Sequence, residues 1–207
     1  PLDMATTAIH SGRNQTLERE NSPPIFLTSS FAYNSAQQAC DVFAGDEGGN
    51  LYSRFTNPTV TAFEERIAAL EGGQKGIAMA SGMAAITSVF LGLLKAGDHM
   101  VLSRSVFGST INLANNLLAK LQIDVTQVTL RDISSWREAI RPQTKLFFVE
   151  TPSNPTLEMV DLAALCRLAK EHNILVVVDN VFCTPFLQKP LELGADVVVH
   201  SATKYLD

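Results

Sequence analysis

Residues 174–180 read ILVVVDN and residues 197–205 read VVVHSATKY, so that two valine-rich runs each end in polar residues. Uninterrupted apolar runs of this kind predict strands that are buried on both faces, as in a parallel sheet covered by helices. Ligands of such sheets bind at the carboxyl ends of the strands. Asp179 and Lys204 follow the two runs. We therefore expect a carboxylate and an amine at the same edge of one sheet.

This carboxylate and amine have two interpretations. Taken singly, Asp179 would most often be a helix cap and Lys204 a solvated surface residue. Taken together, they are what a pyridoxal phosphate enzyme needs, namely a lysine that bonds to the cofactor's aldehyde carbon and an acid that keeps the pyridine nitrogen protonated. Ser201 and Thr203 stand beside the lysine and offer hydroxyl groups to a phosphate. The combination therefore favours a pyridoxal phosphate site.

The composition is that of a soluble globular domain with a hydrophobic core, because 46% of the 207 residues are hydrophobic and 18% are charged. The net charge of −5 offers no attraction for nucleic acid or for an anionic membrane surface. No apolar run approaches the roughly 20 residues of a membrane-spanning helix, and the first residues lack the plan of a signal peptide. We expect a protein without nucleic-acid or membrane partners.

The spacing of cysteine and histidine argues against a disulfide framework and against a metal site. Cys40, Cys166 and Cys183 are far apart and odd in number, and the four histidines show no ligand spacing. The cysteines therefore predict reduced thiols in a cytoplasmic protein.

From residue 58 onward, the chain alternates between apolar runs and helical patterns. Six short runs are expected to form strands, at residues 76–80, 100–102, 124–130, 145–149, 174–178 and 197–199. Helices are expected at residues 58–71, 83–94 and 162–172, in a segment ending at residue 121, and around Trp136. This alternation indicates an α/β fold with a mostly parallel sheet and helices on both faces. The sequence contains neither the glycine-rich nucleotide-binding motifs nor the GxSxG serine motif.

Residues 1–57 are polar and rich in turn-forming residues, and only residues 36–43 predict a short helix. A segment of this length with few core residues is either flexible or packed against another part of the assembly. It contains the sequence LYSRF at residues 51–55. By itself, the arginine of this stretch, Arg54, would most often be a solvated surface residue.

Two further stretches follow predicted strands. Ser81, Gly82 and Met83 stand between a predicted strand and a predicted helix, where free backbone N–H groups and the helix dipole favour an anion. Residues 150–155 read ETPSNP, and the two prolines predict a rigid loop at the carboxyl end of the preceding strand. Without context, each stretch is also compatible with an ordinary turn.

Five short elements occur along the chain in the order YSR (52–54), SGM (81–83), ETPSNP (150–155), DN (179–180) and SATK (201–204). With these elements the chain resembles the Cys/Met-metabolism family of pyridoxal phosphate-dependent enzymes over essentially its whole length. The resemblance implies the large domain of a fold-type-I transferase, similar to aspartate aminotransferase. It also implies a seventh strand and a small C-terminal domain beyond the lysine. Residues 58–207 are then an incomplete cofactor-binding domain, and residues 1–57 an arm that contacts a neighbouring subunit.

The resemblance also implies a role for each matching residue. Lys204 would hold the cofactor covalently and move protons, and Asp179 would keep the pyridine nitrogen protonated. Phe107 would lie on the ring, and Asn154 would bond to the phenolic oxygen of the cofactor. The phosphate would be held by Ser81, Gly82, Met83, Ser201 and Thr203, with Tyr52 and Arg54 from a neighbouring subunit. Such sharing implies a homo-oligomer, and the resemblance suggests a dimer of dimers.

The implied activity depends on one departure from the family pattern. The ring-stacking motif is commonly YGGT-like in the family, whereas residues 107–110 here read FGST. The phenol of a tyrosine is placed to assist a thiol leaving group, and a carboxylate leaving group needs little such help. We therefore expect γ-replacement on an O-acylhomoserine, with O-succinyl-L-homoserine preferred, by sulfide to give L-homocysteine in methionine biosynthesis.

Several alternatives stay open. Cystathionine γ-synthase and the methionine or cystathionine γ-lyases belong to the same family. A binding or regulatory protein on a degenerate enzyme scaffold is disfavoured by the complete set of Lys204, Asp179 and phosphate donors. An α/β enzyme without pyridoxal phosphate would need a motif that the sequence lacks. At Phe107 itself, neutral drift at a stacking position is a further alternative.

Overall fold

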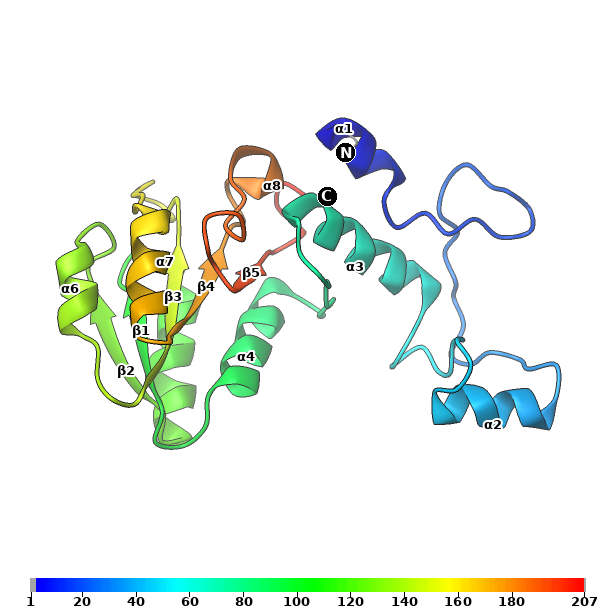
Figure 1. The fold of residues 1–207 in the computed structure, drawn as a ribbon, viewed down its shortest axis with the longest axis horizontal. Helices are drawn as coiled ribbons and strands as arrows, with labels where there is room; N and C mark the ends of the chain where they lie inside the picture. Colours follow the sequence, from blue (N-terminus) through cyan, green and yellow to red (C-terminus); the bar gives the residue numbers. More distant parts are fainter. Residues whose placement is uncertain (1–2, 207) are drawn as a thin grey trace. The chain divides into compact units, whose positions relative to one another are not determined.

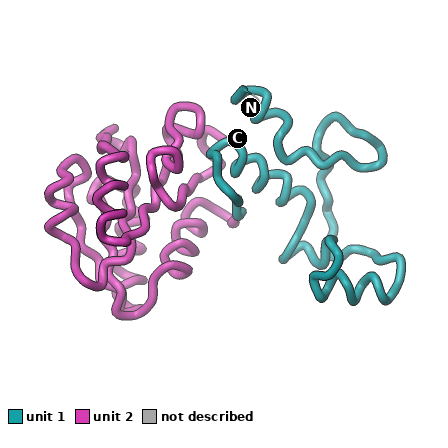
Figure 2. Tube along the Cα trace, viewed as in Figure 1, with its two compact units in different colours: residues 1–78 teal, residues 79–207 magenta. Residues whose placement is uncertain are grey.

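The structure of the protein is a computed structural model that describes residues 3–206 (Figure 1). The chain divides into two compact units, residues 1–78 and residues 79–207 (Figure 2). The parallel sheet lies wholly within the second unit. The predicted boundary between an arm and a large domain, after residue 57, stays a prediction.

The described part of the first unit contains three helices, α1 (Met4–His10), α2 (Ala36–Ala44) and α3 (Pro58–Glu71). Each begins after a side chain that accepts a hydrogen bond from a first-turn N–H, in order Asp3, Ser35 and Asn57. α3 ends at Gly72, whose φ of 72° lies in the left-handed region that glycine tolerates. α1 packs against α3.

Of the elements in this part of the chain, two helices are predicted correctly, one helix is not predicted, and one predicted strand is absent. α2 and α3 confirm the helices expected at residues 36–43 and 58–71. α1 has no signal in the sequence, because MATTAIH shows no apolar stripe and contains two threonines. Residues 76–80 form no strand. The N–H of Ala78 donates instead to Glu64 Oε1 at 2.7 Å, so this backbone group has a side-chain partner in place of a neighbouring strand.

The second unit is built on a fully parallel sheet, and the described residues contribute five strands to it rather than the expected six. These strands are β1 (His99–Ser103), β2 (Asp124–Val128), β3 (Thr144–Glu150), β4 (Leu175–Asp179) and β5 (Val197–Val199). Their order across the sheet is β2-β1-β3-β4-β5. The register places Leu102 beside Phe148, and Glu150 beside Asp179.

Helices cover both faces of this sheet. On one face, α6 (Ile133–Glu138) and α7 (Leu162–Glu171) share a buried cluster with β3, in which Trp136 packs against Phe147. On the other face, α4 (Gly82–Leu93) packs Phe90 edge-on against Phe148 of β3. Successive side chains of a strand point to opposite faces, so both faces of β3 are apolar. The expected α/β fold with helices on both faces is confirmed.

After β1 and after β3, the chain turns to opposite faces of the sheet. β1 leads into α5 (Gly108–Leu113) and the π-helical segment η1 (Ala114–Leu118), which pack on the face of α4. β3 leads into α7 on the other face. The carboxyl ends of β1 and β3 therefore form the point where the strand order reverses, and open α/β sheets bind ligands in the crevice at such a point.

Two local differences from the expected elements lie in this unit. The helix expected to reach residue 121 divides into α5 and η1, where the side-chain amide of Asn116 donates to the carbonyl of Asn112 at 3.0 Å. This bond competes with the backbone hydrogen bond of a regular helix. A short helix, α8 (Thr184–Leu187), follows β4 and has too few residues to show a periodic pattern.

Candidate active site

Asp179 ends β4 at the carboxyl edge of the sheet and is only 9% exposed. Its register partners are Glu150 on β3 and Val199 on β5. Burial raises the pKa of Asp179 to about 6, against the lowering effects of the Val181 N–H, which donates to Asp179 Oδ1 at 3.1 Å, and of the charge of His200. A cation placed here would favour the ionised carboxylate. Asp179 is thus suited to a protonated ring nitrogen.

The start of α4 and the loop after β5 meet closely. Ser81 caps α4 by accepting from the N–H of Ala84, which leaves the N–H groups of Gly82 and Met83 without an acceptor inside the helix. A Cβ on Gly82 would lie only 2.8 Å from the Cβ of Ser201. Position 82 therefore needs a glycine for this close approach.

The loop after β5 carries two hydroxyl groups on the same side. Ser201 Oγ and Thr203 Oγ1 lie 3.1 Å apart. With the N–H groups at the start of α4, they form a set of neutral donors beside a helix N-terminus, which is the kind of site that binds phosphate. The structure thus brings together the SGM and SATK elements, which are far apart in the sequence. They meet where Gly82 approaches Ser201.

Lys204 follows the two hydroxyl residues in a turn, where its N–H donates to the carbonyl of Ser201 at 3.2 Å. Its side chain is exposed. Because β5 lies beside β4, the lysine and Asp179 come from adjacent strands at one edge, as the sequence predicts.

Phe107 and Asn154 follow β1 and β3, the two strands between which the strand order reverses. The ring of Phe107 is 46% exposed, and Asn154 is exposed as well. The backbones of both residues are anchored by one side chain, Glu150. Its Oε2 accepts from the N–H of Phe107 at 2.6 Å, and its Oε1 accepts from the N–H of Asn154 at 3.1 Å.

Glu150 is a site residue that the sequence argument misses. It is 2% exposed, and burial together with the charge of Asp179 raises its pKa to about 7, although the two N–H donors act in the opposite direction. A signal does exist in the sequence, because Glu150 ends a buried apolar run in the same way as Asp179. The structure places the two carboxyl groups side by side on neighbouring strands.

Tyr52 and Arg54 belong to the first unit, whereas the other predicted site residues belong to the second. Tyr52 forms an isolated bridge with Ser30, and the guanidinium of Arg54 lies 5.4 Å from the Tyr52 ring centre and 4.9 Å from that of Phe55. Within residues 3–206, Arg54 makes no ion pair. Its cationic group is therefore held by aromatic rings and keeps its donors for an anion.

These residues fit the phosphate and the ring of pyridoxal phosphate. The fit rests on the neutral donors at the start of α4, the hydroxyls of the β5 loop and the buried acid at the end of β4. Residues 3–206 hold no group of three or more acidic, histidine or cysteine side chains that could bind a metal ion. In the same part of the chain, every helix is too short or too polar to cross a membrane.

A sequence model of a family described as Cys/Met metabolism pyridoxal phosphate-dependent enzymes matches residues 5–207. The chain belongs to this family. Pyridoxal phosphate is the cofactor of the Cys/Met metabolism family, and the resemblance inferred from the five sequence elements is confirmed.

Two relatives show how far this similarity extends. O-Succinylhomoserine sulfhydrylase from Pseudomonas aeruginosa is 52% identical over 202 residues, which are 98% of this chain and 50% of the relative. L-Methionine gamma-lyase from Fusobacterium nucleatum subsp. nucleatum is 47% identical over 205 residues, covering 99% of this chain and 52% of the relative. The chain thus spans about half the length of the curated relatives it matches.

Solved structures of the Cys/Met metabolism family have the same fold. A Campylobacter jejuni protein assigned as an O-acetylhomoserine (thiol)-lyase, which carries N'-pyridoxyl-lysine-5'-monophosphate, matches all of this chain with a TM-score of 0.94 and 35% identity. The metB protein of Corynebacterium glutamicum matches 99% of this chain with a TM-score of 0.92 and 37% identity. This chain covers 51% and 52% of those two chains.

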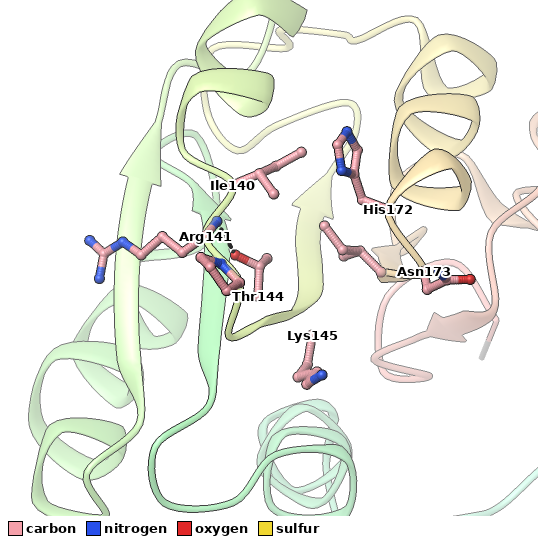
Figure 3. A pocket seen from close by; sticks show the side chains of 8 residues that line it. Ile140, Arg141, Thr144, Lys145, His172 and Asn173 are labelled. Atoms are coloured by element: carbon pink, nitrogen blue, oxygen red, sulfur yellow. Dashed lines mark hydrogen bonds between the residues drawn. The ribbon is translucent and has the colours of Figure 1, made fainter.

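A cavity of about 490 Å³ lies at the opposite, amino edge of the sheet (Figure 3). Arg141, Lys145, His172 and Asn173 are among its lining residues. A second cavity of about 410 Å³ shares Lys145 and Asn173 with it. Neither is lined by any of the predicted site residues that the structure describes. Cavity volume therefore does not mark the candidate active site of this chain.

Proposed function

We propose that this chain is the cofactor-binding part of an enzyme that acts on an O-acylhomoserine, with O-succinyl-L-homoserine as the preferred substrate. The reaction exchanges a bond from the γ-carbon to oxygen for a bond to sulfur. O-Succinyl-L-homoserine and hydrogen sulfide would give L-homocysteine and succinate, with no change in oxidation state. Such a reaction supplies homocysteine for methionine biosynthesis. The 52% identity to the P. aeruginosa sulfhydrylase supports this proposal.

The residues of this chain would divide the work between binding and proton transfer. Pyridoxal phosphate, when bound, supplies an electron sink that stabilises negative charge at the substrate α-carbon. Asp179 would hold a proton on the pyridine nitrogen, and the positive charge there would lower the pKa of this carboxyl from the value of about 6 that burial produces. Lys204 Nζ would hold the cofactor through its aldehyde carbon and would carry protons between substrate carbons.

The phosphate site would be shared between subunits. Gly82 and Met83 would donate backbone N–H groups, while Ser201 and Thr203 would donate hydroxyl hydrogens. Tyr52 and Arg54 of a second copy would complete the set, because arginine binds phosphate through two parallel hydrogen bonds. We include in the proposal a homotetramer, which the family resemblance suggests, and a cytoplasmic location, which the cysteines predict.

The observation that carries the choice of substrate is the phenylalanine at position 107. Its backbone N–H donates to Glu150 at the carboxyl edge of the sheet, and its ring is 46% exposed, so it can stack on a planar ligand. Phenylalanine has no hydroxyl group to protonate a leaving group. A thiolate leaving group benefits from an acid, whereas the succinate carboxylate is already a stable anion. A phenyl ring at this position therefore favours ester substrates.

A second candidate is a methionine γ-lyase, which the 47% identity to the F. nucleatum enzyme supports. Steady-state rates of the full-length protein would separate the two. We expect a higher kcat/KM for O-succinyl-L-homoserine with sulfide than for cleavage of L-methionine, and Phe107→Tyr should raise the cleavage rate several-fold. Phe182→Tyr, a second phenylalanine of the same unit, is the matched control and should leave the ratio unchanged. Faster methionine cleavage by the unaltered protein would refute the sulfhydrylase assignment.

A further inference from the structure

The position of Glu150 is energetically unfavourable for an ionised side chain. It is 2% exposed at the end of β3, and its register partner on β4 is a second buried acid, Asp179. Burial of a carboxylate beside a like charge destabilises the ionised form, which agrees with the raised pKa of Glu150. A neutral side chain at position 150 would avoid this destabilisation, but it would not offer two acceptor oxygens.

The two oxygens of Glu150 serve two loops that diverge. Oε2 accepts from Phe107 N–H, at the start of α5, at 2.6 Å, and Oε1 accepts from Asn154 N–H at 3.1 Å. The loop after β1 turns to the face of α4, whereas the chain after β3 continues to α7 on the other face. Glu150 therefore joins the two loops that leave the sheet where the strand order reverses, which is where open α/β sheets bind ligands.

Only a carboxylate can make both bonds from this position. Glutamate accepts through two oxygens and donates through neither, whereas glutamine offers one acceptor oxygen and an NH2 group that would face a backbone N–H. A nearby carboxylate makes a different tie. Glu158 Oε2 accepts from Ser105 Oγ at 2.6 Å, so it binds the same β1 loop without touching the backbone of Phe107 or Asn154.

We propose that Glu150 is a positioning residue for the cofactor ring. Its two hydrogen bonds set the distance between Phe107, which would stack on the ring, and Asn154, which would contact the phenolic oxygen. The inference rests on the proposed roles of these two residues. Glu150 itself touches neither substrate nor cofactor in this proposal, and it acts through the backbones of the residues that do.

The test uses the full-length apoprotein, with pyridoxal phosphate itself as the probe. The dissociation constant comes from an absorbance titration, the visible circular dichroism of the bound cofactor reports the ring's surroundings, and thermal unfolding of the apoprotein reports stability. Glu150→Gln should weaken cofactor binding about tenfold and change the visible circular dichroism, because one of the two hydrogen bonds is lost. Glu150→Asp keeps the charge and both acceptors, and should recover part of the affinity. If Glu150→Gln does not fold, Glu150→Asp carries the test, with a smaller loss of affinity than tenfold and a changed dichroism band expected.

The matched control is Glu158→Gln, which should lower the melting temperature while leaving affinity and dichroism unchanged within twofold. A Glu150 variant that is less stable, yet binds the cofactor with unaltered affinity and dichroism, would show a loop cap only and overturn the inference. Equal effects of the Glu150 and Glu158 variants on affinity would overturn it too. Failure of the unaltered protein to bind pyridoxal phosphate would instead refute the proposed cofactor site, and the inference with it.

Discussion

The amino and carboxyl edges of the sheet differ in how their buried polar groups are paired. At the amino edge, His99 begins β1 and lies between the two neighbouring strands, with ring nitrogens 2.7 Å from Thr144 Oγ1 and 2.9 Å from Thr126 Oγ1. Arg141 adds one hydrogen bond to Thr126 Oγ1, at 2.9 Å, and an ion pair of 3.4 Å to Asp124. The buried imidazole is thus paired with two hydroxyls of the neighbouring strands, and an exposed ion pair of opposite charges lies at the same edge.

At the carboxyl edge, the buried groups of neighbouring strands have the same sign. Glu150 and Asp179 are register partners, and each has a raised pKa. The N–H groups of Phe107, Asn154 and Val181 donate to these two carboxyl groups, and an exposed lysine and two hydroxyls lie on the loop after β5. The amino edge is thus a paired polar network, although the cavities lie there, whereas the carboxyl edge keeps two neighbouring buried acids with raised pKa, as the proposed ligand site requires.

The largest expected effect that tests the difference between the two edges is the loss of turnover on substituting a lysine at each edge. In the full-length protein, Lys204→Ala should still bind pyridoxal phosphate through the phosphate site, but turnover should fall at least about a thousandfold, because one amine both holds the cofactor and moves protons. Steady-state rates and absorbance after borohydride treatment measure the two properties.

Lys145→Ala at the amino edge is the control for this prediction, and its turnover should stay within twofold of the unaltered protein. Lys145 lines both cavities and belongs to no predicted site element. Near-native turnover in Lys204→Ala, or an equal loss in both variants, would contradict the assignment of the carboxyl edge.

The next effect is the pH dependence of stability in the full-length apoprotein. The pKa values of Glu150 and Asp179 are raised to about 7 and about 6, from ordinary values of 4.5 and 3.8. The folded state therefore binds more protons than the unfolded state between these values. The stability contributed by each group is full below about pH 4 and falls by about 3 kcal/mol as the pH rises through the folded pKa. Urea unfolding of Asp179→Asn between pH 4 and pH 7 should show a shallower fall than the unaltered protein.

His99 at the amino edge should give the opposite sign. Burial, followed by the charge of Arg141, lowers its pKa below 6.5, so the unfolded state binds the proton more readily. Its contribution to the free energy of unfolding is present above pH 6.5 and is lost as the pH falls. His99→Gln should remove this acid-side loss and leave the carboxylate effect in place. Equal pH profiles for the Asp179 and His99 variants would remove the distinction between the edges.

The smallest expected effect concerns two glycines of α4, one near each edge. Gly82→Ala would place a Cβ 2.8 Å from that of Ser201. We expect it to destabilise the protein by about 1–3 kcal/mol and to weaken cofactor binding, as overpacking does. Gly92→Ala has no atom within 4 Å of its Cβ, and should be neutral or stabilising by up to about 1 kcal/mol. Thermal unfolding and cofactor titration would measure both variants, and unchanged affinity in Gly82→Ala would argue against the phosphate cradle.

Sequence patterns predict the parts of this molecule that depend on local periodicity. The apolar runs of β3, β4 and β5 are continuous because helices cover both faces of the sheet, and α3 carries both a cap and a terminal glycine. The strand expected at residues 76–80 fails, because a run of apolar residues does not specify a pairing partner. At the junction of α5 and η1, the side chain of Asn116 bonds to the carbonyl of Asn112, and periodicity does not report such a bond.

The candidate site is predictable only in part for a related reason. Asp179 and Lys204 have a strand-end signal, but their roles, and those of Phe107 and Asn154, come from the family resemblance and stay predictions. Sequence analysis misses Glu150 because its proposed role depends on hydrogen bonds to two loops, one of which is 43 residues away in the sequence. Tyr52 and Arg54 act in the proposal on a second copy, which one chain does not contain.

The order of the strands has a consequence for synthesis on the ribosome. β3, β4 and β5 are added successively on the same side of β1, so the growing chain can extend its sheet strand by strand. The ribosome adds about 5–20 residues per second, and Lys204 therefore leaves it on the order of seconds after Asp179. With the roles proposed above, the nascent chain would during that interval have the acid for the pyridine nitrogen but not the lysine that holds the cofactor. Covalent capture of the cofactor would then wait until the residues after the fifth strand have left the ribosome.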